Sequence, residues 1–574
     1  MTYIRVSTPA GDKHRLSAHA TTIALLLPVI IVLALSVGWP LLTIILRSVH
    51  EKGRSNFSDP LYFGHYAAIV QDDLLRQVAL HSVMLAFVSM VVTLILAFPA
   101  AYVISRLSRR ISSLMMVLVL MPFWVSIIVR LFAFTTILGT QGIINSVAGV
   151  FGVGPFPLLY NTFATIVGMV AYLLPYFILI LVSAMMSIDT SLLTAARTMG
   201  ASERRVFFDI YFPQVRPPLL GGSVLVFILG LGFFLTPAIL GGPHNLTIPI
   251  FIQQQVQNYQ WGKAAAMGIV LLAVSIVGYV LALNIGGKGM LSPVQQGSRG
   301  VTARDPLRPT PVTGICVAVL VFDLVLLILP LLVVIPTSVT QTTQIQFPPV
   351  GFSMKWFVEA LTSPIWIDAF LKSIRVGVLT AVFTTLCGLA LARVGTRSNS
   401  PVLKTAIQIM AIIPLIVPVI LLGIGIYDVQ GRLNLLGTDF GLVVAHAVLC
   451  LPLVFLVLAN SLAAVDISIE QAAWSMGASN TRSFWDIVVP LAMPALVGSF
   501  LISFVTSWDE AVLAMFQTEL DKTLPVTIYS FLRSGITPAV SAVATIIIAP
   551  VLLGTIIVAA KSFITSRSAT KARI

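Results

Sequence analysis

The chain has 574 residues, of which 57% are hydrophobic and 10% are charged, and its formal net charge is +13. Soluble globular chains carry about 25% charged residues, so this composition excludes an ordinary water-soluble domain. The 34 Lys and Arg residues are spread along the flanks of apolar blocks and are not gathered in one soluble region, which argues against nucleic-acid binding.

Twelve apolar blocks are long enough to cross a bilayer, which takes a helix of about 20 residues. Backbone groups in lipid must find their hydrogen bonds within the segment, so we expect helices, and the blocks do not alternate as barrel strands do. The sequence therefore predicts an all-α integral membrane protein with about 12 transmembrane helices. Their approximate centres in chain order are Ile30, Val92, Leu120, Val170, Phe227, Ala273, Val321, Phe383, Leu415, Pro452, Ile502 and Val551.

The first block, residues 21–46, is too long for the core of a signal peptide, and we interpret it as a retained first span. With the N-terminus in the cytoplasm, 22 of the 34 basic residues fall in cytoplasmic segments, in keeping with the positive-inside rule. An even number of spans then places both termini in the cytoplasm. The basic edges suit the anionic membrane lipid of the inner leaflet.

The chain repeats itself in the cytoplasmic loop that follows the fourth span of each half. Residues 189–217 (the first repeated loop) and residues 466–494 (the second repeated loop) align without a gap at an offset of 277, with 14 of 29 positions identical. Each half therefore has six spans in the same orientation, which predicts two parallel six-helix repeats. The expected divisions are a first six-span module in 1–285, a cytoplasmic linker rich in Gly, Ser, Pro and Arg in 286–311, and a second six-span module in 312–574.

Each repeated loop has the pattern of two short helices joined by a tight turn. Asp189 and Asp466 are placed to cap a helix, and Gly200 and Gly477 are placed to end it with a left-handed residue. One interpretation is a loop that only folds back on the helix bundle. The other is a pair of docking sites for two identical or similar cytoplasmic partners, which also explains why both halves keep the pattern.

The two loops resemble the signature of the permeases of binding-protein-dependent ABC importers, which reads Glu-Ala-Ala, three residues, Gly, nine residues and Ile-x-Leu-Pro. Both copies keep the Ala-Ala pair, the Gly, the Ile and the Pro at that spacing, but both lack the leading Glu and the Leu before the Pro. The resemblance implies that each loop is a coupling helix seated on an ATPase subunit. The residues it assigns to ATPase coupling are Thr194, Ala195, Ala196, Gly200 and Ala201 in the first copy, and Gln471, Ala472, Ala473, Gly477 and Ala478 in the second.

The same resemblance implies a bacterial inner-membrane location, two cytoplasmic ATPase subunits forming a homodimer, and an external solute-binding protein. The chain shows no phosphate-loop signature of its own, because Ala282 stands where the first Gly of the nearest fragment would be. We see no catalytic or metal-binding cluster, and we interpret Cys316, Cys387 and Cys450 as core residues. We therefore expect a transporter subunit that is not an enzyme, has no cofactor or metal, and depends on ATP bound by its partners.

Charged side chains within the predicted spans are candidates for the translocation path, because charge in lipid is costly and tends to be functional. Asp509 and Glu510 follow Trp508 in the eleventh span, and Phe233 stands at the position of the first half that corresponds to Glu510. The alternative for such charges is that they form buried ion pairs that lock helices together. Further charged candidates are Asp323 in the seventh span and Arg130 towards the outer end of the third span.

Two segments resemble the permeases of spermidine/putrescine importers: Leu235–Ala266 resembles the first permease and Ser507–Thr545 the second. The resemblance implies a fused permease for a polyamine, and acidic groups such as Glu510 suit a polycation. Phe233 departs from that family, whose members tend to carry an acid there, so permeases for ferric iron, thiamine, phosphonate or opine are alternatives. The rival class is a secondary transporter with six plus six helices, which would need intramembrane acids or broken helices but no doubled docking loops.

Overall fold

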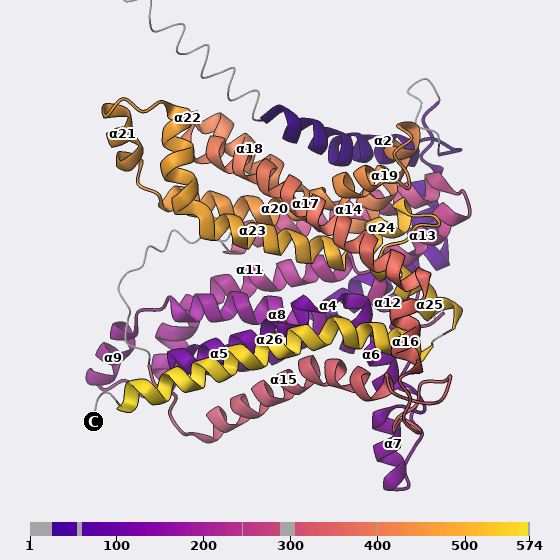
Figure 1. Cartoon of the computed structure of the whole chain (residues 1–574), viewed down its shortest axis with the longest axis horizontal. Helices are drawn as coiled ribbons and strands as arrows, with labels where there is room; N and C mark the ends of the chain where they lie inside the picture. The colour runs from indigo at the N-terminus through magenta and orange to yellow at the C-terminus, as the bar shows by residue number, and fades with distance from the viewer. Residues whose placement is uncertain are drawn as a thin grey trace, which may run out of the picture. The chain divides into compact units, whose positions relative to one another are not determined.

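The structure is a computed structural model that describes residues 26–53, 60–243, 245–286, 305–398, 400–535 and 537–571. These residues fold as helices joined by turns and loops (Figure 1). Eleven of the helices are long and apolar enough to cross a membrane, and one bent helix pair brings the number to 12. The prediction of an all-α membrane protein with about 12 spans is therefore confirmed.

The helices of the first half begin with a candidate span over Leu26–Ser48, which includes η1 (Ala34–Gly38) and α2 (Trp39–Ser48). Short helices then alternate with long ones up to the predicted linker. In chain order these are α3 (Gly64–Gln71), α4 (Asp73–Arg106), α5 (Arg109–Leu120), η2 (Met121–Trp124), α6 (Ile127–Leu138), α7 (Ile143–Val150), α8 (Thr162–Met186), α9 (Thr190–Thr198), α10 (Glu203–Arg205), η3 (Val206–Tyr211), α11 (Phe212–Leu231), α12 (Leu235–Leu240), α13 (Ile248–Gln257) and α14 (Trp261–Gly286).

The second half shows the same alternation of long and short helices. Its first span, α15, covers Pro311–Thr337, and its last, α26, covers Pro538–Lys571. Between them lie α16 (Lys355–Thr362), α17 (Pro364–Arg397), α18 (Pro401–Ile416), α19 (Val419–Arg432), α20 (Asp439–Ala464), α21 (Ile467–Ser475), α22 (Asn480–Ser483), η5 (Phe484–Val488), α23 (Val489–Asp509), α24 (Val512–Gln517) and α25 (Leu524–Ser534).

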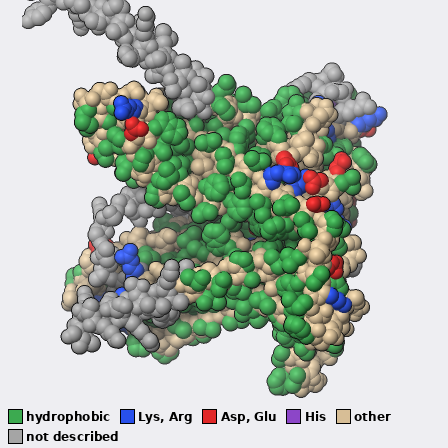
Figure 2. All heavy atoms as spheres, viewed as in Figure 1, with side chains coloured by type: hydrophobic (Ala, Val, Ile, Leu, Met, Phe, Trp, Pro, Cys, Tyr) green, Lys and Arg blue, Asp and Glu red, His purple; other side chains and the backbone are tan. Residues whose placement is uncertain are grey.

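The outer surface of the long helices is apolar. Figure 2 shows hydrophobic side chains over most of one face. On α17, for example, Leu379 and Leu386 are exposed, and on α15 Val321 and Phe322 are exposed. A surface of this kind is poorly suited to water and well suited to contact with lipid chains.

In each half, the helix is interrupted near the predicted centre of the third span, which is Leu120 in the first half and Leu415 in the second. α5 ends at Leu120, and extended backbone at Val125 separates η2 from α6. In the second half, α18 and α19 meet at an angle of 102° across Val417 and Pro418. Proline pushes the residue before it out of the helical region, and Val417 is extended (ψ 123°), so Pro418 accounts for this break.

The chain forms two compact units that do not follow the linear halves. Of the described residues, unit 1 contains 26–43, 374–417 and 421–518, and unit 2 contains the others. Within unit 2, α15, the first span of the second half, packs against α4, α6 and α26. The predicted module boundaries at 285 and 312 stay predictions, and residues 287–304 of the predicted linker lie outside the described residues.

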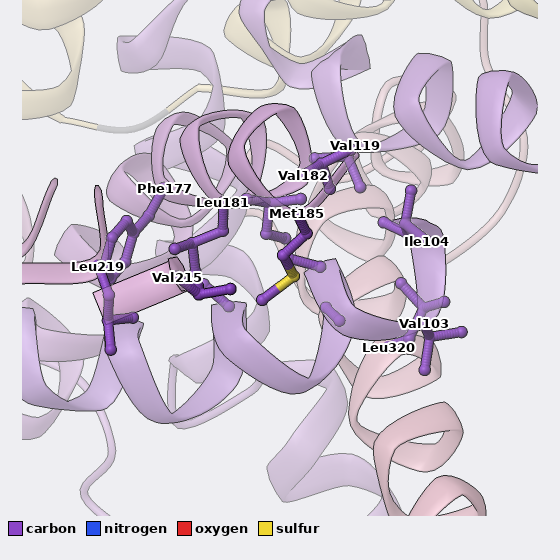
Figure 3. Close-up of a cluster of buried hydrophobic side chains, with 14 of the residues drawn as sticks. Val103, Ile104, Val119, Phe177, Leu181, Val182, Met185, Val215, Leu219 and Leu320 are labelled. Atoms are coloured by element: carbon purple, nitrogen blue, oxygen red, sulfur yellow. The ribbon is translucent and has the colours of Figure 1, made fainter. Parts of the chain in front are cut away.

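A buried apolar cluster in unit 2 joins the spans to the first repeated loop. Figure 3 shows side chains of this cluster, among them Ile104 on α4, Leu181 and Met185 on α8 and Leu320 on α15. The same cluster includes residues of the repeated loop itself, namely Leu193, Ala196, Val206 and Tyr211. The loop is therefore packed onto the ends of the spans as part of one core, and it is not a free connection.

A serine in the second span of each half holds the segment that precedes the last span. The Ser82 hydroxyl accepts a hydrogen bond from the backbone N–H of Ile248, and the Ser373 hydroxyl accepts one from the N–H of Leu524, both at 2.8 Å. Each N–H belongs to the first residue of a short helix, α13 or α25, which lacks a partner within that helix. The two halves thus share a serine-to-helix hydrogen bond that the alignment of the repeated loops did not reveal.

Candidate functional site

The first repeated loop begins, as predicted, with a capped helix that leads into a left-handed glycine. The Asp189 carboxylate accepts a hydrogen bond from the backbone N–H of Ser191 at 2.9 Å, which caps α9. Gly200, two residues beyond α9, has a φ of +85°, a conformation that side chains other than Gly rarely adopt. The Ser202 hydroxyl then accepts from the N–H of Arg205 and caps α10.

The second repeated loop has the same three features at an offset of 277. Asp466 accepts a hydrogen bond from the N–H of Ser468 at 2.9 Å, and this bond lowers the pKa of the Asp466 carboxyl. Gly477 has a φ of +90°, and the Ser479 hydroxyl accepts from the N–H of Arg482 at 3.2 Å. The predicted caps and glycine turns are therefore confirmed in both copies.

The residues assigned to coupling divide in the same way in both loops. Their exposed members are Thr194, Ala195 and Gly200 in the first loop and Gln471, Ala472 and Gly477 in the second. Their buried or half-buried members are Ala196, Ala201, Ala473 and Ala478. The second Ala of each pair therefore packs the helix onto the core, while the first is open to a partner.

Large apolar side chains are exposed at equivalent places on the two loops. Met199 is 82% exposed and Met476 is 81% exposed, each directly before the glycine turn. Phe208 and Trp485, which correspond at the same offset, are both 55% exposed. Exposed apolar side chains grouped with polar ones are typical of surfaces that bind another protein.

A group of charged residues holds the first repeated loop, and sequence reasoning missed it. The guanidinium of Arg197, on α9, donates two hydrogen bonds to the carboxylate of Asp305 and two to that of Glu203. These bonds raise the pKa of Arg197 above its ordinary value, and the bonds to Asp305 have the largest effect. Asp305 lies within the predicted linker, where nothing in the sequence pairs it with a residue 108 positions earlier.

A different ion pair holds the second repeated loop. Glu470, which has no exposed surface, accepts hydrogen bonds from Arg393 at 3.0 Å and from Arg397 at 2.8 Å. The two arginines lie four residues apart at the end of α17, so both reach the same carboxylate. Burial raises the pKa of Glu470, but the two guanidinium groups outweigh it and hold the pKa below its ordinary value. The i, i+4 spacing of the two arginines is the sequence feature that could have indicated a shared acidic partner.

The acidic path candidates lie where α23 ends. Trp508 stacks on Phe504 with ring centroids 6.1 Å apart, and α23 ends at the next residue, Asp509. Glu510 is half-buried, and its carboxylate accepts a hydrogen bond from the backbone N–H of Leu513 at 2.8 Å. Glu510 therefore caps α24 with one oxygen, which leaves further acceptor capacity on the same carboxylate.

Small polar side chains line the contact between α20 and α23 beside these acids. His446 Nδ1 lies 2.8 Å from the Ser507 hydroxyl, and the Cys450 thiol donates to the backbone carbonyl of Ser503. The Ser503 hydroxyl also bonds Thr384 of α17. These polar groups share one side of α23, because serines four residues apart fall on the same helix face.

In the first half, Phe233 lies in an aromatic group that includes a buried positive charge. Its ring meets that of Tyr172 edge to face, with centroids 5.0 Å apart, and Arg130 lies over the same tyrosine ring at 5.3 Å. Tyr172 is near the middle of α8, and the location of Arg130 towards the outer end of the third span stays a prediction. Arg130 is the fourth residue of α6.

The described ion pairs bear on the alternative that the intramembrane charges lock helices together. Among the described residues, no ion pair is formed by Arg130, Asp323 or Glu510. Arg130 is 93% buried and its Nε has no hydrogen-bond partner in the described structure. Both carboxylate oxygens of Asp323 are also without a hydrogen bond there. In the part of the chain that the structure describes, none of these three charges therefore joins helices through an ion pair.

The family profile described as "Binding-protein-dependent transport system inner membrane component" matches residues 89–288 and 384–564, which is more than half of the chain. The chain belongs to this family. One match lies in each half, so this binding-protein-dependent permease carries two copies of the family's membrane domain. The expected fused ABC-importer permease of the inner membrane is thereby confirmed.

Individual relatives include both kinds of permease from one transport system. The spermidine/putrescine permease PotB of Salmonella typhimurium (strain LT2) is 31% identical over 255 residues, which is 42% of this chain and 88% of the relative. The permease PotC of Haemophilus influenzae is 30% identical over 203 residues, which is 34% of this chain and 77% of the relative. Among solved structures, a bacterial alginate ABC transporter is 18% identical, with a TM-score of 0.42, and the match covers 48% of this chain and 97% of that one.

The family assignment also decides against a secondary transporter. Broken helices were expected of that class, and the described part of this permease contains a bent helix pair, α18 and α19. Broken helices therefore do not separate the two classes here. The two family domains do, because each matches the profile of the inner membrane components of binding-protein-dependent transport systems.

Proposed function

We propose that this permease forms the membrane path for a polyamine such as spermidine or putrescine. The observation that carries the proposal is that a single chain is at least 30% identical to both PotB and PotC, the two permeases of spermidine/putrescine systems. An external solute-binding protein delivers the solute, and cytoplasmic ATPase subunits bind the ATP that drives import. Both termini of the permease face the cytoplasm.

The two repeated loops are the docking sites for the ATPase subunits. Support comes from the matched exposure of Ala195 with Ala472 and of Met199 with Met476, since equal surfaces suit two copies of one protein. Each loop is also packed or ion-paired onto the ends of long helices, so a push on the loop moves the spans. Closure of an ATPase homodimer would in this way change the arrangement of the two halves.

Glu510 is the residue proposed to meet the polyamine. Its carboxylate is half-buried, has no ion-pair partner among the described residues and keeps acceptor capacity beyond its cap to Leu513. An ammonium group would supply the missing positive charge. Trp508, Asp509 and Phe233 complete the proposed path, and the aromatic rings can lie against the methylene chain or the ammonium groups of a polyamine.

Arg130 favours a second candidate, an anionic solute such as a phosphonate or an opine. A guanidinium stays charged in proteins, and burying it without an anion costs several kcal/mol. The described residues supply no anion to Arg130, and it lies beside the same Tyr172 that contacts Phe233. A carboxylate or phosphonate of the solute would satisfy that charge, whereas an ammonium group would be repelled.

Uptake of radiolabelled spermidine by cells that carry the whole transport system separates the two candidates. For a polyamine, Glu510→Gln should raise KM about 10-fold or more, because a charge-assisted hydrogen bond contributes about 1.5–3 kcal/mol. Glu519→Gln, a change at an exposed acid, is the matched control and should leave uptake unchanged. Saturable uptake of a labelled phosphonate or opine that is lost in Arg130→Gln, with no spermidine uptake, would replace the polyamine by the anionic candidate.

A further inference from the structure

The end of the predicted linker, residues 305–308, contacts the first repeated loop through charged side chains. We propose that these residues are a latch that positions the first repeated loop for its partner, so that the connection between the two halves also holds one of the docking sites. This inference rests on the proposed docking function of the loop. The positioning residues are Arg197, Glu203, Asp305 and Arg308, with Arg106 beneath them.

The contact at the centre of the latch joins Arg197 to Asp305. Two guanidinium nitrogens of Arg197 donate to the two carboxylate oxygens of Asp305, each at 2.9 Å, in the bidentate geometry that fixes direction as well as distance. The Arg197 side chain is 19% exposed and that of Asp305 is 11% exposed. Little water therefore competes for this pair, unlike an ordinary surface ion pair, which contributes little.

Neighbouring charges extend the pair into a network. Glu203, on α10, accepts from Arg197 at 3.0 and 3.1 Å and also from Arg308. On the other side, Arg106 at the end of α4 lies 3.7 Å from Asp305. Three segments of the chain thus meet here: the second span, the first repeated loop and the residues that lead into α15.

Contacts with two tyrosines hold the Arg106 side chain in place, and Arg106 in turn lies beside Asp305. Its guanidinium lies between the rings of Tyr102 and Tyr211, at 3.9 and 4.5 Å from their centroids, and donates to the Tyr211 hydroxyl at 3.1 Å. Tyr211 belongs to the buried cluster that packs the loop. Through Arg106 and Tyr211, the charged residues of the latch therefore contact the buried apolar cluster that packs the loop.

Comparison with the second repeated loop shows why the first needs this anchor. Glu470 ties the second loop to α17, but the corresponding residue of the first loop is Leu193, which cannot form an ion pair. Conversely, Trp474 stands where the first loop has Arg197. Among the described residues, Glu470 joins the second loop to two arginines of α17, whereas Arg197 of the first loop pairs with Asp305 from the segment between the halves. A shift at the start of α15, which begins three residues after Arg308, would accordingly be transmitted to the first loop.

The test measures hydrogen exchange of residues 190–205 and ATP hydrolysis in the full chain, in nanodiscs with the ATPase that co-purifies with it. Asp305→Asn and Arg197→Gln should each make exchange in this loop about 5–10-fold faster, as expected for the loss of a charged, bidentate contact, and lower ATP hydrolysis several-fold. Asp305→Glu keeps the charge and should restore most of both. Arg110→Glu, at an exposed arginine with no described ion pair, is the control and should change neither.

The outcomes separate the latch from the docking function on which it rests. Unchanged exchange in Asp305→Asn would overturn the latch, whatever the rate of ATP hydrolysis. Faster exchange with unchanged hydrolysis would show that the latch orders the loop but does not position it for coupling, which overturns the positioning role. Faster exchange and reduced hydrolysis, both reversed in Asp305→Glu, would establish the proposal.

Discussion

One residue difference between the repeated loops decides how each is anchored. Leu193 and Glu470 occupy equivalent positions, and both are buried, but the first packs in an apolar cluster and the second neutralises two arginines. A buried carboxylate without its partners would be costly, so Arg393 and Arg397 are required wherever Glu470 is present. The loops therefore share a backbone shape while differing in the interactions that hold it.

The Glu470 pair should make the second repeated loop sensitive to acid. Its folded pKa is depressed, so the pair contributes stability above the unfolded pKa of about 4.3 and loses it as the pH falls through the folded value. We predict that protection of α21 against hydrogen exchange decreases below about pH 4 in the full chain. Glu470→Gln should lower this protection by about 1–3 kcal/mol at pH 7 and abolish the acid-dependent part.

Asp486→Asn is the control for this pH effect. Asp486 pairs with Arg482 on the same loop, but the two side chains are 62% and 77% exposed, so the pair should contribute little. An acid-dependent loss of protection that persists unchanged in Glu470→Gln would contradict the assignment.

At the scale of elements, the glycine turns fix the angle between the two short helices of each loop. No atom lies within 4 Å of a Cβ added at Gly200 or Gly477, so only backbone conformation restricts these positions. The bend between α18 and α19 also has a local cause. Where the break falls at Val417–Pro418, the sequence already carries the cause, because the residue before a proline leaves the helical region.

Substitution at Gly477 tests the turn. Gly477→Ala should destabilise the second loop by about 1–2 kcal/mol, since a Cβ is disfavoured at positive φ, whereas Gly477→Asn should cost less because Asn tolerates this region better. The measurement is hydrogen exchange of residues 467–483, together with retention of the ATPase during purification. Gly498→Ala, at a glycine inside α23 that also has open space around it, should not loosen the loop. Equal effects of Ala and Asn at Gly477 would show that the turn does not depend on the left-handed conformation.

At the scale of the whole molecule, the like orientation of the halves is the claim on which the proposed function depends. Ala195→Cys and Ala472→Cys place reporters at exposed, equivalent positions of the two loops. We predict that a membrane-impermeant maleimide labels both in inside-out vesicles and neither in intact cells. Leu520→Cys, 97% exposed between α24 and α25, should label from the outside. Labelling of the two alanine positions from opposite sides would contradict the parallel arrangement.

The sequence by itself determined the membrane class, the number of spans, the repeat and the local form of the two loops. Each of these depends on interactions between residues close in the chain: apolar runs long enough for a bilayer, a capping aspartate, a glycine that permits positive φ. The same local rules could have predicted the break at Pro418, but the length of the apolar block concealed it. The family resemblance added the assignment of the loops to coupling, which stays a proposal.

Only the tertiary structure decided which charges meet. Arg197 finds Asp305 across 108 residues, and Arg393 finds Glu470 across 77, and no periodicity in the sequence encodes such pairs. It also decided that Arg130 lies over the ring of Tyr172 and that the helices group into units that cross the linear halves. The physical reason is that these contacts depend on how helices pack side by side, and packing depends on many side chains at once, whereas a span, a cap or a turn depends on a few neighbours.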